Sequence, residues 1–445
     1  MAREWAEQGR EFSLDISSYG RNDRDSALHR LQVLIMAGQA PDIIMLDHAP
    51  WSDTISLHRF LGSGAFADIW ELINNCPYTN RDDFYTNILD AWEVDGKLHA
   101  LPVTFGFDYV GINATLPQSI IDQFNAYDFI SMHQLLQLYL ELQEHYYEDY
   151  GHLAIFNNLE FFSPFHIIAQ SLNGFVDFEN RISTIMDDEF IALLENWRRV
   201  FYGRGLFDFR ERGRYLSAVR PTATMVTLSM ETSRYVFRIE NHVLLPINAL
   251  FPNSNPYFIY HIPVTDEHGR LRQAHPMYAS GVSGDIPFYW GAGHLAVPLI
   301  TASADGAVAW EFLRHLLTAF ITTQLPDERN PWHRANTLAT PINRDYFADH
   351  MWHIFEFSTR RDNPFYWCPR RPRFDTEDER MDNIEMAISR LAGYNEMPVT
   401  SPFFLPSGLF SDLLDTFLRA PDDFMGARDV AQQLHNRVAL WLIEP

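Results

Sequence analysis

Lysine, cysteine and long apolar runs are scarce in this chain of 445 residues, and each of these features argues against one class of protein. Lys97 is the only lysine, and 34 basic residues stand against 58 acidic ones, which gives a formal net charge of -24. A nucleic-acid-binding protein needs a basic surface along the phosphate backbone. We therefore expect neither DNA nor RNA as a partner, and no docking on an anionic membrane surface.

The two cysteines, Cys76 and Cys368, are too few for a disulfide scaffold or a cysteine-based zinc site. Whether they pair with each other stays open at this point, although two buried free thiols are the simpler expectation. No run of about 18 apolar residues occurs, so no segment is expected to span a membrane. Residues 1–12 lack the apolar middle region of a signal peptide.

Enzyme motifs are missing as well. The sequence contains no G-x-S-x-G, no phosphate-cradling G-x-x-x-x-G-K-[ST], no dinucleotide fingerprint and no H-E-x-x-H. A glycosidase would need two carboxylates placed across a sugar, and no pair stands out among the 58 acidic residues. The sequence predicts a protein that is not an enzyme and needs no cofactor.

The chain is too long to fold around a single compact core, so two or three domains are expected. Hydrophobic residues make up 47% of the chain and charged residues 21%, an ordinary globular balance, whereas the 14% of aromatic residues is high. These aromatic residues suit a large core, and they also suit a binding cleft built from flat faces.

The hydrophobic pattern predicts an α/β chain. Alternating residues at 12–17 indicate a strand, helical spacing follows at 26–36, and the apolar run "APDIIMLD" at 40–47 indicates a buried parallel strand. Strand, helix and strand in this order form a βαβ unit. Further helices are predicted at 131–146, 187–206, 305–320 and 427–445.

The stretch "EVDGKLHALPVTFGFDYVGINATL", residues 93–116, combines a turn with a strand that leaves its sheet. Asp95-Gly96 separates two short strands at 92–94 and 98–101, as in a β-hairpin, and 107–112 is a further strand. Pro102 lacks a backbone donor and fixes one dihedral angle, which suits a departing strand.

Four stretches in order carry a resemblance to one family. They are "RLQVLIMAGQAPDIIMLD", "DGKLHALPVTFGFDYVGINATL", "GHLAVPLITASADGAVAWEFLRHLLT" and "TPINRDYF". The chain resembles the extracellular solute-binding proteins of ABC importers, family 1, the group that contains the maltose-binding protein. Ile112-Asn113 stands where that family has Tyr-Asn.

The resemblance implies a two-lobed α/β periplasmic-binding-protein fold of type II. Lobe 1 would comprise 1–104 plus 293–340, and lobe 2, which is richer in helices, 110–288 plus 343–445. Hinge crossings would lie near 101–109, 289–295 and 338–342. The implied function is capture of a solute, a carbohydrate or oligosaccharide, between the lobes by a monomer that delivers it to the transmembrane subunits of a permease through hinge closure.

Family members begin with a signal segment, a lipid-attachment cysteine and a first strand before the part seen here. The resemblance therefore implies a bacterial lipoprotein on the extracellular face of the cell membrane, and we expect this chain to lack those first elements.

Candidate ligand-binding residues follow from the resemblance and from position. "FNNLEFFSPFHIIA" resembles a segment that places a carboxylate and an aromatic ring in the cleft, so Glu160 would accept hydroxyl hydrogen bonds and Phe162 would stack on a sugar. Both Phe161 and Phe162 could equally be core. Asp47, His48 and Trp51 follow a buried strand at its carboxyl end, where ligands bind in open α/β sheets.

The crossings supply the other candidates. Phe105, Phe107 and Asp108 come just after the first crossing and would line the cleft floor. Tyr289 and Trp290 lie at the second crossing beside Gly291 and Gly293, which permit close backbone approach. Trp310 is predicted to be core, and no metal site is expected at His350 and His353, which have no third ligand in view.

Alternative functions remain at this point. The same fold could bind a peptide or a sugar phosphate, and a sensor ectodomain could pass closure to another partner. A carbohydrate-active enzyme would convert a glycan that a binding protein only retains.

Overall fold

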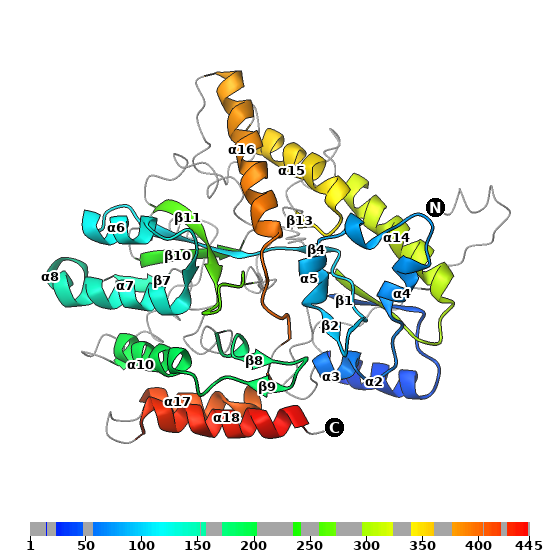
Figure 1. Ribbon diagram of the computed structural model, residues 1–445, viewed down its shortest axis with the longest axis horizontal. Coiled ribbons are helices and arrows are strands. Elements are labelled where there is room, and N and C mark those ends of the chain that lie inside the picture. Colours follow the sequence, from blue (N-terminus) through cyan, green and yellow to red (C-terminus); the bar gives the residue numbers. More distant parts are fainter. Residues whose placement is uncertain are drawn as a thin grey trace, which may run out of the picture.

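The structure is a computed structural model with two groups of elements, one on each side of Figure 1. It describes residue 15 and residues 24–47, 57–151, 153–156, 171–202, 235–241, 258–272, 296–323, 340–359, 376–403, 405–419 and 425–443. Helices and strands are mixed along the chain. The predicted α/β class is therefore confirmed.

The left-hand group in Figure 1 is built on a five-stranded mixed sheet in the order β6-β11-β5-β10-β7. β5 pairs antiparallel with both β10 and β11, whereas the outer strands β7 and β6 run parallel to β10 and β11, respectively. All six residues of β5 are buried, as expected for a central strand. The strands are β5 (Asp108–Asn113), β6 (Ile130–Ser131), β7 (Ala154–Phe156), β10 (Tyr235–Asn241) and β11 (Phe258–Thr265).

Helices cover this sheet, and their ends follow local sequence signals. Ser131 caps α7 through its hydroxyl, which accepts from the Gln134 backbone at 3.3 Å, while the Gln134 side chain accepts from the Ser131 backbone at 2.8 Å. A small hairpin, β8 (Val176–Asp177) with β9 (Ile182–Ser183), lies near the C-terminal helices. The helices of this group are α6 (Gln118–Asn125), α7 (Met132–His145), α8 (Tyr147–Tyr150), α10 (Asp188–Tyr202), α17 (Ser411–Arg419) and α18 (Ala427–Ile443), with the 3₁₀ turn Ser407–Leu409.

The right-hand group contains a two-stranded sheet, in which β1 (Ile43–Asp47) pairs antiparallel with β12 (Ala296–Ile300). β12, the partner of β1 among the described residues, comes from much later in the chain. The strand predicted to run parallel to β1, at 12–17, lies outside the described residues, so the parallel pairing stays a prediction. The helices around it are α2 (Arg24–Met36), α3 (Leu57–Leu61), α4 (Ile69–Asn74), α5 (Thr86–Asp90) and α14 (Gly306–Thr323), with the 3₁₀ turn Arg81–Asp83.

The hairpin predicted at Asp95-Gly96 is present as β2 (Glu93–Val94) and β3 (Lys97–Leu98). Asp95 and Gly96 have φ values of 52° and 71°, the left-handed conformation that two-residue hairpin turns require. The helices predicted at 26–36, 131–146, 187–206, 305–320 and 427–445 correspond to α2, α7, α10, α14 and α18. The strand predicted at 12–17 lies outside the described residues.

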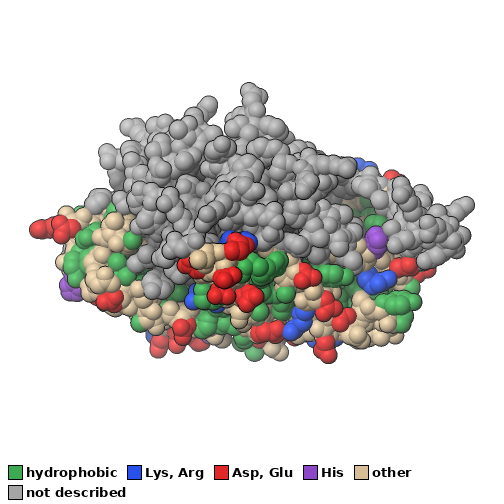
Figure 2. All heavy atoms as spheres, turned by 90° about the horizontal axis from the view of Figure 1, so that it is seen from above, with side chains coloured by type: hydrophobic (Ala, Val, Ile, Leu, Met, Phe, Trp, Pro, Cys, Tyr) green, Lys and Arg blue, Asp and Glu red, His purple; other side chains and the backbone are tan. Residues whose placement is uncertain are grey.

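Trp310 is only 3% exposed, which confirms its predicted place in the core. Cys76 carries a free thiol, and Cys368 lies outside the described residues. On the face shown in Figure 2, acidic side chains are visibly more frequent than Lys and Arg among the coloured atoms, in keeping with the net charge of -24. No helix in the described ranges combines the length and the hydropathy that a membrane crossing would need.

Candidate ligand-binding site

Three segments that are distant in the sequence meet between the two groups. β4 (Thr104–Phe105) pairs antiparallel with β13 (Thr340–Pro341), and the Ile342 backbone donates to the Val103 carbonyl at 3.1 Å. The Tyr85 backbone in turn donates to the Ile342 carbonyl at 3.1 Å. β4 and β13 fall within two of the predicted crossings, 101–109 and 338–342, and they lie at the centre of Figure 1. The lobe boundaries themselves stay a prediction.

Two long helices follow this junction. α15 (Arg344–Thr359) begins directly after β13, and α16 (Glu377–Asn395) returns toward it from the top of Figure 1. Arg344 anchors the start of α15, because its Nε donates to the Phe84 carbonyl at 2.9 Å and its guanidinium lies 4.9 Å from the Tyr85 ring centre. The same guanidinium makes two hydrogen bonds to the Glu396 carboxylate, at 2.7 and 3.0 Å. The junction is therefore held by side chains as well as by backbone pairing.

Phe105 and Phe107, predicted to line the cleft floor, pack among aromatic rings. The ring centres of Phe105 and Phe107 are 5.5 Å apart, and Tyr85 meets Phe105 edge-on at 5.4 Å. Phe347 of α15 packs on Tyr85 at 5.9 Å. Each phenylalanine is only 2% exposed, so both act as core residues in this structure. Their contact with a ligand stays a prediction.

Asp108, also predicted for the cleft floor, forms a buried ion pair with Arg272. Oδ2 of Asp108 lies 3.2 Å from Nε of Arg272, and the side chains are 4% and 7% exposed. The Asp108 backbone also donates to the Arg272 carbonyl at 3.2 Å. Burial raises the pKa of Asp108 to about 6, although the nearby guanidinium of Arg272 opposes that shift.

Glu267 adds a second carboxylate to this cluster. The residue as a whole is half-buried, but both of its carboxylate oxygens are buried. Burial, with a smaller contribution from the neighbouring Asp266, raises the pKa of Glu267 to about 7, although backbone amides of Glu267 and His133 oppose the shift. Burial also lowers the pKa of Arg272, against the attraction of Asp108 and Glu267. Three ionisable groups therefore lie out of water beside the first crossing.

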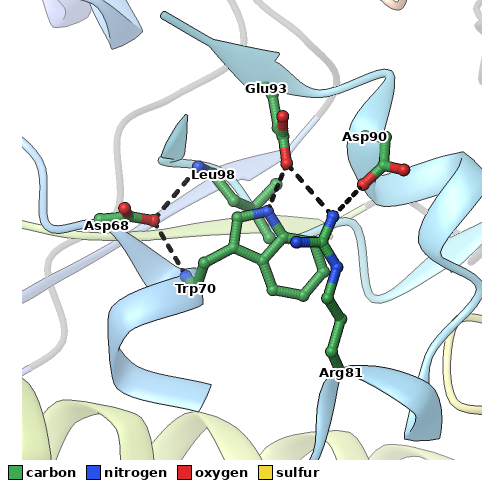
Figure 3. A network of polar contacts seen from close by, with 6 residues as sticks. All are labelled: Asp68, Trp70, Arg81, Asp90, Glu93 and Leu98. Atoms are coloured by element: carbon green, nitrogen blue, oxygen red, sulfur yellow. Dashed lines mark hydrogen bonds and ion pairs between the residues drawn. The ribbon is translucent and has the colours of Figure 1, made fainter. Parts of the chain in front are cut away.

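A polar network fixes the hairpin that precedes the first crossing (Figure 3). Asp68 caps α4 by accepting from the Trp70 backbone at 3.0 Å, and the same oxygen accepts from the Leu98 backbone at 3.3 Å. The Trp70 indole donates to Glu93 at 2.6 Å, while Arg81 stacks 4.0 Å above the Trp70 ring centre. Burial raises the pKa of Glu93. The network joins α4 to both strands of the hairpin.

Arg81 also bridges two carboxylates in the same view. Its Nη2 lies 2.6 Å from Asp90 and 3.6 Å from Glu93 (Figure 3). The cation lies over the indole ring with carboxylates at its edge, and the side chains of Arg81 and Asp90 are 47% and 49% exposed.

The other predicted site residues are placed only in part. The backbone of Asp47 ends β1 and pairs with Ala296, but its side chain is not described. Glu160, Phe162, His48, Trp51, Tyr289 and Trp290 lie outside the described residues. The structure thus brings Phe105, Phe107 and Asp108 together beside the crossing strands, and the grouping of the other candidates stays a prediction.

Sequence reasoning missed Arg272, Glu267 and Tyr85. The segment "TDEHGRLR" did carry a signal, because four charged residues surround a glycine directly after the apolar strand β11. Tyr85 had no such signal, since it approaches β4 only through the tertiary fold. For metals, no group of three or more His, Cys, Asp or Glu side chains suited to an ion occurs within the described ranges.

Comparisons with known proteins yield structures but no sequence relatives. No protein-family model matches the chain, and no curated protein matches its sequence. The sugar-binding protein MalE from Xanthomonas citri is similar in structure, with a TM-score of 0.54 and 12% identity, over 99% of this chain and 93% of that one. An ABC substrate-binding protein from Listeria monocytogenes in complex with cycloalternan has a TM-score of 0.51 and 11% identity, over 98% and 93%.

UgpB from Mycobacterium tuberculosis in complex with glycerophosphocholine is also similar, with a TM-score of 0.51 and 13% identity, over 99% of this chain and 92% of that one. The first is described as a sugar-binding protein and the second as an ABC substrate-binding protein, and each of the three is covered almost completely. At these identities the likeness concerns the fold alone. The chain therefore has the two-lobed α/β fold of the MalE-like solute-binding proteins, as its sequence motifs predicted.

Proposed function

We propose that this chain is the substrate-binding component of an ABC importer. It captures a carbohydrate, in particular an oligosaccharide, between its lobes and delivers it to the permease by closing about the crossing strands. The observation that carries this proposal is the fold, matched over nearly the whole length of solute-binding proteins and joined at β4 and β13. Two paired crossing segments form the kind of hinge that domain closure needs.

A carbohydrate is favoured over other solutes for two reasons. One similar structure is described as a sugar-binding protein and another holds cycloalternan. The chain also carries 34 Phe, 19 Tyr and 11 Trp, and such flat rings stack on the apolar faces of sugars. In this proposal the ligand meets Asp47, His48, Trp51, Glu160, Phe162, Tyr289 and Trp290, with Phe105, Phe107 and Asp108 below it.

The remaining parts of the proposal follow from the same role. The protein acts as a monomer at the extracellular face of a bacterial membrane, held there by a lipid in its full-length form. Lobe 1 comprises 1–104 and 293–340, and lobe 2 comprises 110–288 and 343–445. It performs no chemistry on its ligand, and its protein partners are the transmembrane subunits of the permease.

A thermal-shift screen tests the proposal. Purified protein is heated with mono- and oligosaccharides, with peptides and sugar phosphates as comparison sets, and with glycerophosphocholine because a similar structure holds it. A ligand that binds only the native state raises the melting temperature by mass action. We expect a rise with one glycan series and recovery of that glycan unchanged. A rise with phosphates or peptides alone would move the chain to another ligand class, and cleavage of the glycan would make it an enzyme.

A further inference from the structure

The two groups of elements touch at a second place, apart from the crossing strands. There α3 and the β2–β3 turn of the first group meet the β8–β9 turn, Phe403 and the end of α18 from the second group. We call this surface the interlobe latch, and its members are His58, Arg59, Trp92 and Asp95 on one side and Phe178, Glu179, Arg181, Phe403 and Trp441 on the other. The helices α3 and α18 and the strands β2, β8 and β9 lie in the lower half of Figure 1.

We propose that the interlobe latch is a proton-sensitive contact, which holds the two lobes in the arrangement of this structure and releases them when His58 becomes protonated. The inference rests on the proposed function only in treating the two groups as lobes that move against each other. Its test needs no ligand.

Aromatic rings form the centre of the latch. Phe403 meets His58 edge-on at a ring separation of 5.0 Å and Trp92 at 6.1 Å. Phe178, at the tip of the β8–β9 hairpin, lies 5.7 Å from His58 and packs edge-on against Trp441 at 6.2 Å. Phe178 and Phe403 are 3% and 2% exposed. Because these rings come from both lobes, moving the lobes apart would expose them to water.

Polar contacts cross the same surface. The Asp95 backbone donates to the Glu179 carboxylate at 2.9 Å. The guanidinium of Arg59 donates to the backbone carbonyl of Trp441 and lies 4.5 Å from the centre of the Trp441 indole ring. A Cβ added to Gly62, just after α3, would lie 3.1 Å from Val94, so α3 and the hairpin are packed together as one unit. The α3 and hairpin side of the latch is therefore a preformed surface.

His58 is the member of the latch whose charge changes near neutral pH. Its Nε2 is buried and has no hydrogen-bond partner in the described part of the chain. Burial lowers the pKa of His58 below the ordinary value of 6.5, and Arg181 and Arg59 lower it further, while Asp95 opposes them. The other sides of the ring face Phe178 and Phe403, which offer no counter-charge.

The direction of the pH effect follows from this shift. His58 regains its ordinary pKa, about 6.5, when the latch opens into water, so the open form binds a proton more readily than the latched form. The latch is therefore at full strength above about pH 6.5 and weakens as the pH falls through that value toward the lower pKa of the latched state.

Pulsed electron paramagnetic resonance, which measures the distance between two spin labels, tests the latch. The labels are placed at exposed Asn74→Cys on α4 and Gln433→Cys on α18, in a chain with Cys76→Ser and Cys368→Ser. At about pH 7.5 we expect one narrow distance distribution, and at about pH 5 at least half of the molecules should move to a longer or broader one. His58→Phe should keep the narrow distribution at both pH values.

His58→Lys carries a positive charge at neutral pH, so it should show the broad distribution at about pH 7.5. His145→Lys on the exposed end of α7 is the matched control and should behave as the parent does. An unchanged distribution in the parent between the two pH values would overturn the proposal, as would an equal pH response in His58→Phe. If His58→Lys fails to fold, the parent and His58→Phe decide the question together. None of these outcomes depends on carbohydrate binding.

Discussion

Asp108 and Arg272 form a buried ion pair at the start of the central strand β5, with 3.2 Å between Oδ2 and Nε. The pair links the first residue of β5 to the turn that follows β11. Nη2 of Arg272 has no hydrogen-bond partner among the described residues. A buried charge with so few partners stays ionised largely because of the opposite charge beside it.

Removing one member of this pair should therefore destabilise the fold. We expect Asp108→Asn to lower the free energy of unfolding by about 3 kcal/mol, because the buried Arg272 would lose its ion-pair partner. Urea unfolding followed by circular dichroism measures the change. Asp108→Asn combined with Arg272→Met should recover most of the loss. The exposed pair of Arg428 and Asp188 is the control, and Arg428→Ala should cost less than about 1 kcal/mol.

A double variant that is no more stable than Asp108→Asn would contradict this account. It would mean that Arg272 stabilises the turn through the packing of its side chain. The loss in Asp108→Asn would then not come from an uncompensated charge on Arg272.

Glu267 should make stability depend on pH. Its pKa is raised to about 7 in the folded protein, against an ordinary value of 4.5. The folded state therefore prefers the protonated carboxyl, and this contribution is fully present below about pH 4.5 and lost as the pH rises through about 7. We expect Glu267→Gln to be more stable than the parent at pH 8, by on the order of 2–3 kcal/mol, and equal to it near pH 4.5.

Urea unfolding of parent and variant across this pH range checks the expectation. Exposed Glu385→Gln on α16 is the control and should follow the parent at every pH. If the free energies of unfolding of the parent and of Glu267→Gln change with pH in parallel, then the pKa of Glu267 is not raised in the folded protein.

The sequence predicted those parts of the fold that local signals determine. The hairpin at Asp95-Gly96 was located correctly because few residue pairs adopt positive φ, and helices such as α7 carry their own caps. Four ordered motifs identified the fold, although no single motif was specific. The antiparallel pairing of β1 with β12 was not predicted, because it depends on a strand that lies far along the chain.

The candidate site was less accessible to prediction, for a physical reason. Phe105 and Phe107 were chosen because they follow a crossing strand, but whether a ring faces a ligand or other rings depends on tertiary packing. Here Tyr85 packs on Phe105 and is itself packed against Phe347. Arg272 was missed since nothing local shows that it meets Asp108.

The turn that precedes the first crossing offers a third prediction. Gly96 has a φ of 71°, and a Cβ added there would meet nothing within 4 Å, so backbone strain is the main effect of a substitution. We expect Gly96→Ala to lower the free energy of unfolding by about 1 kcal/mol. Gly393 lies inside α16, and a Cβ added there would also meet nothing within 4 Å, so it is the matched control. There, Gly393→Ala should raise the stability by up to about 1 kcal/mol. Losses of equal size at both positions would contradict the role of backbone conformation.

Trp290 offers the most direct test of the predicted site. If it stacks on a sugar, then Trp290→Ala should raise the Kd for the glycan found in the screen at least about tenfold, or about 1.4 kcal/mol. The melting temperature without ligand should hardly change. Isothermal titration calorimetry measures the first effect and a thermal melt the second. Trp310, which is 3% exposed in α14, provides the opposite pattern, because Trp310→Ala should lower stability by about 3–5 kcal/mol through the loss of core packing. If Trp290→Ala instead lowers stability and leaves the affinity of the folded fraction unchanged, then Trp290 is a core residue and the stacking surface must be sought at Trp51 or Phe162.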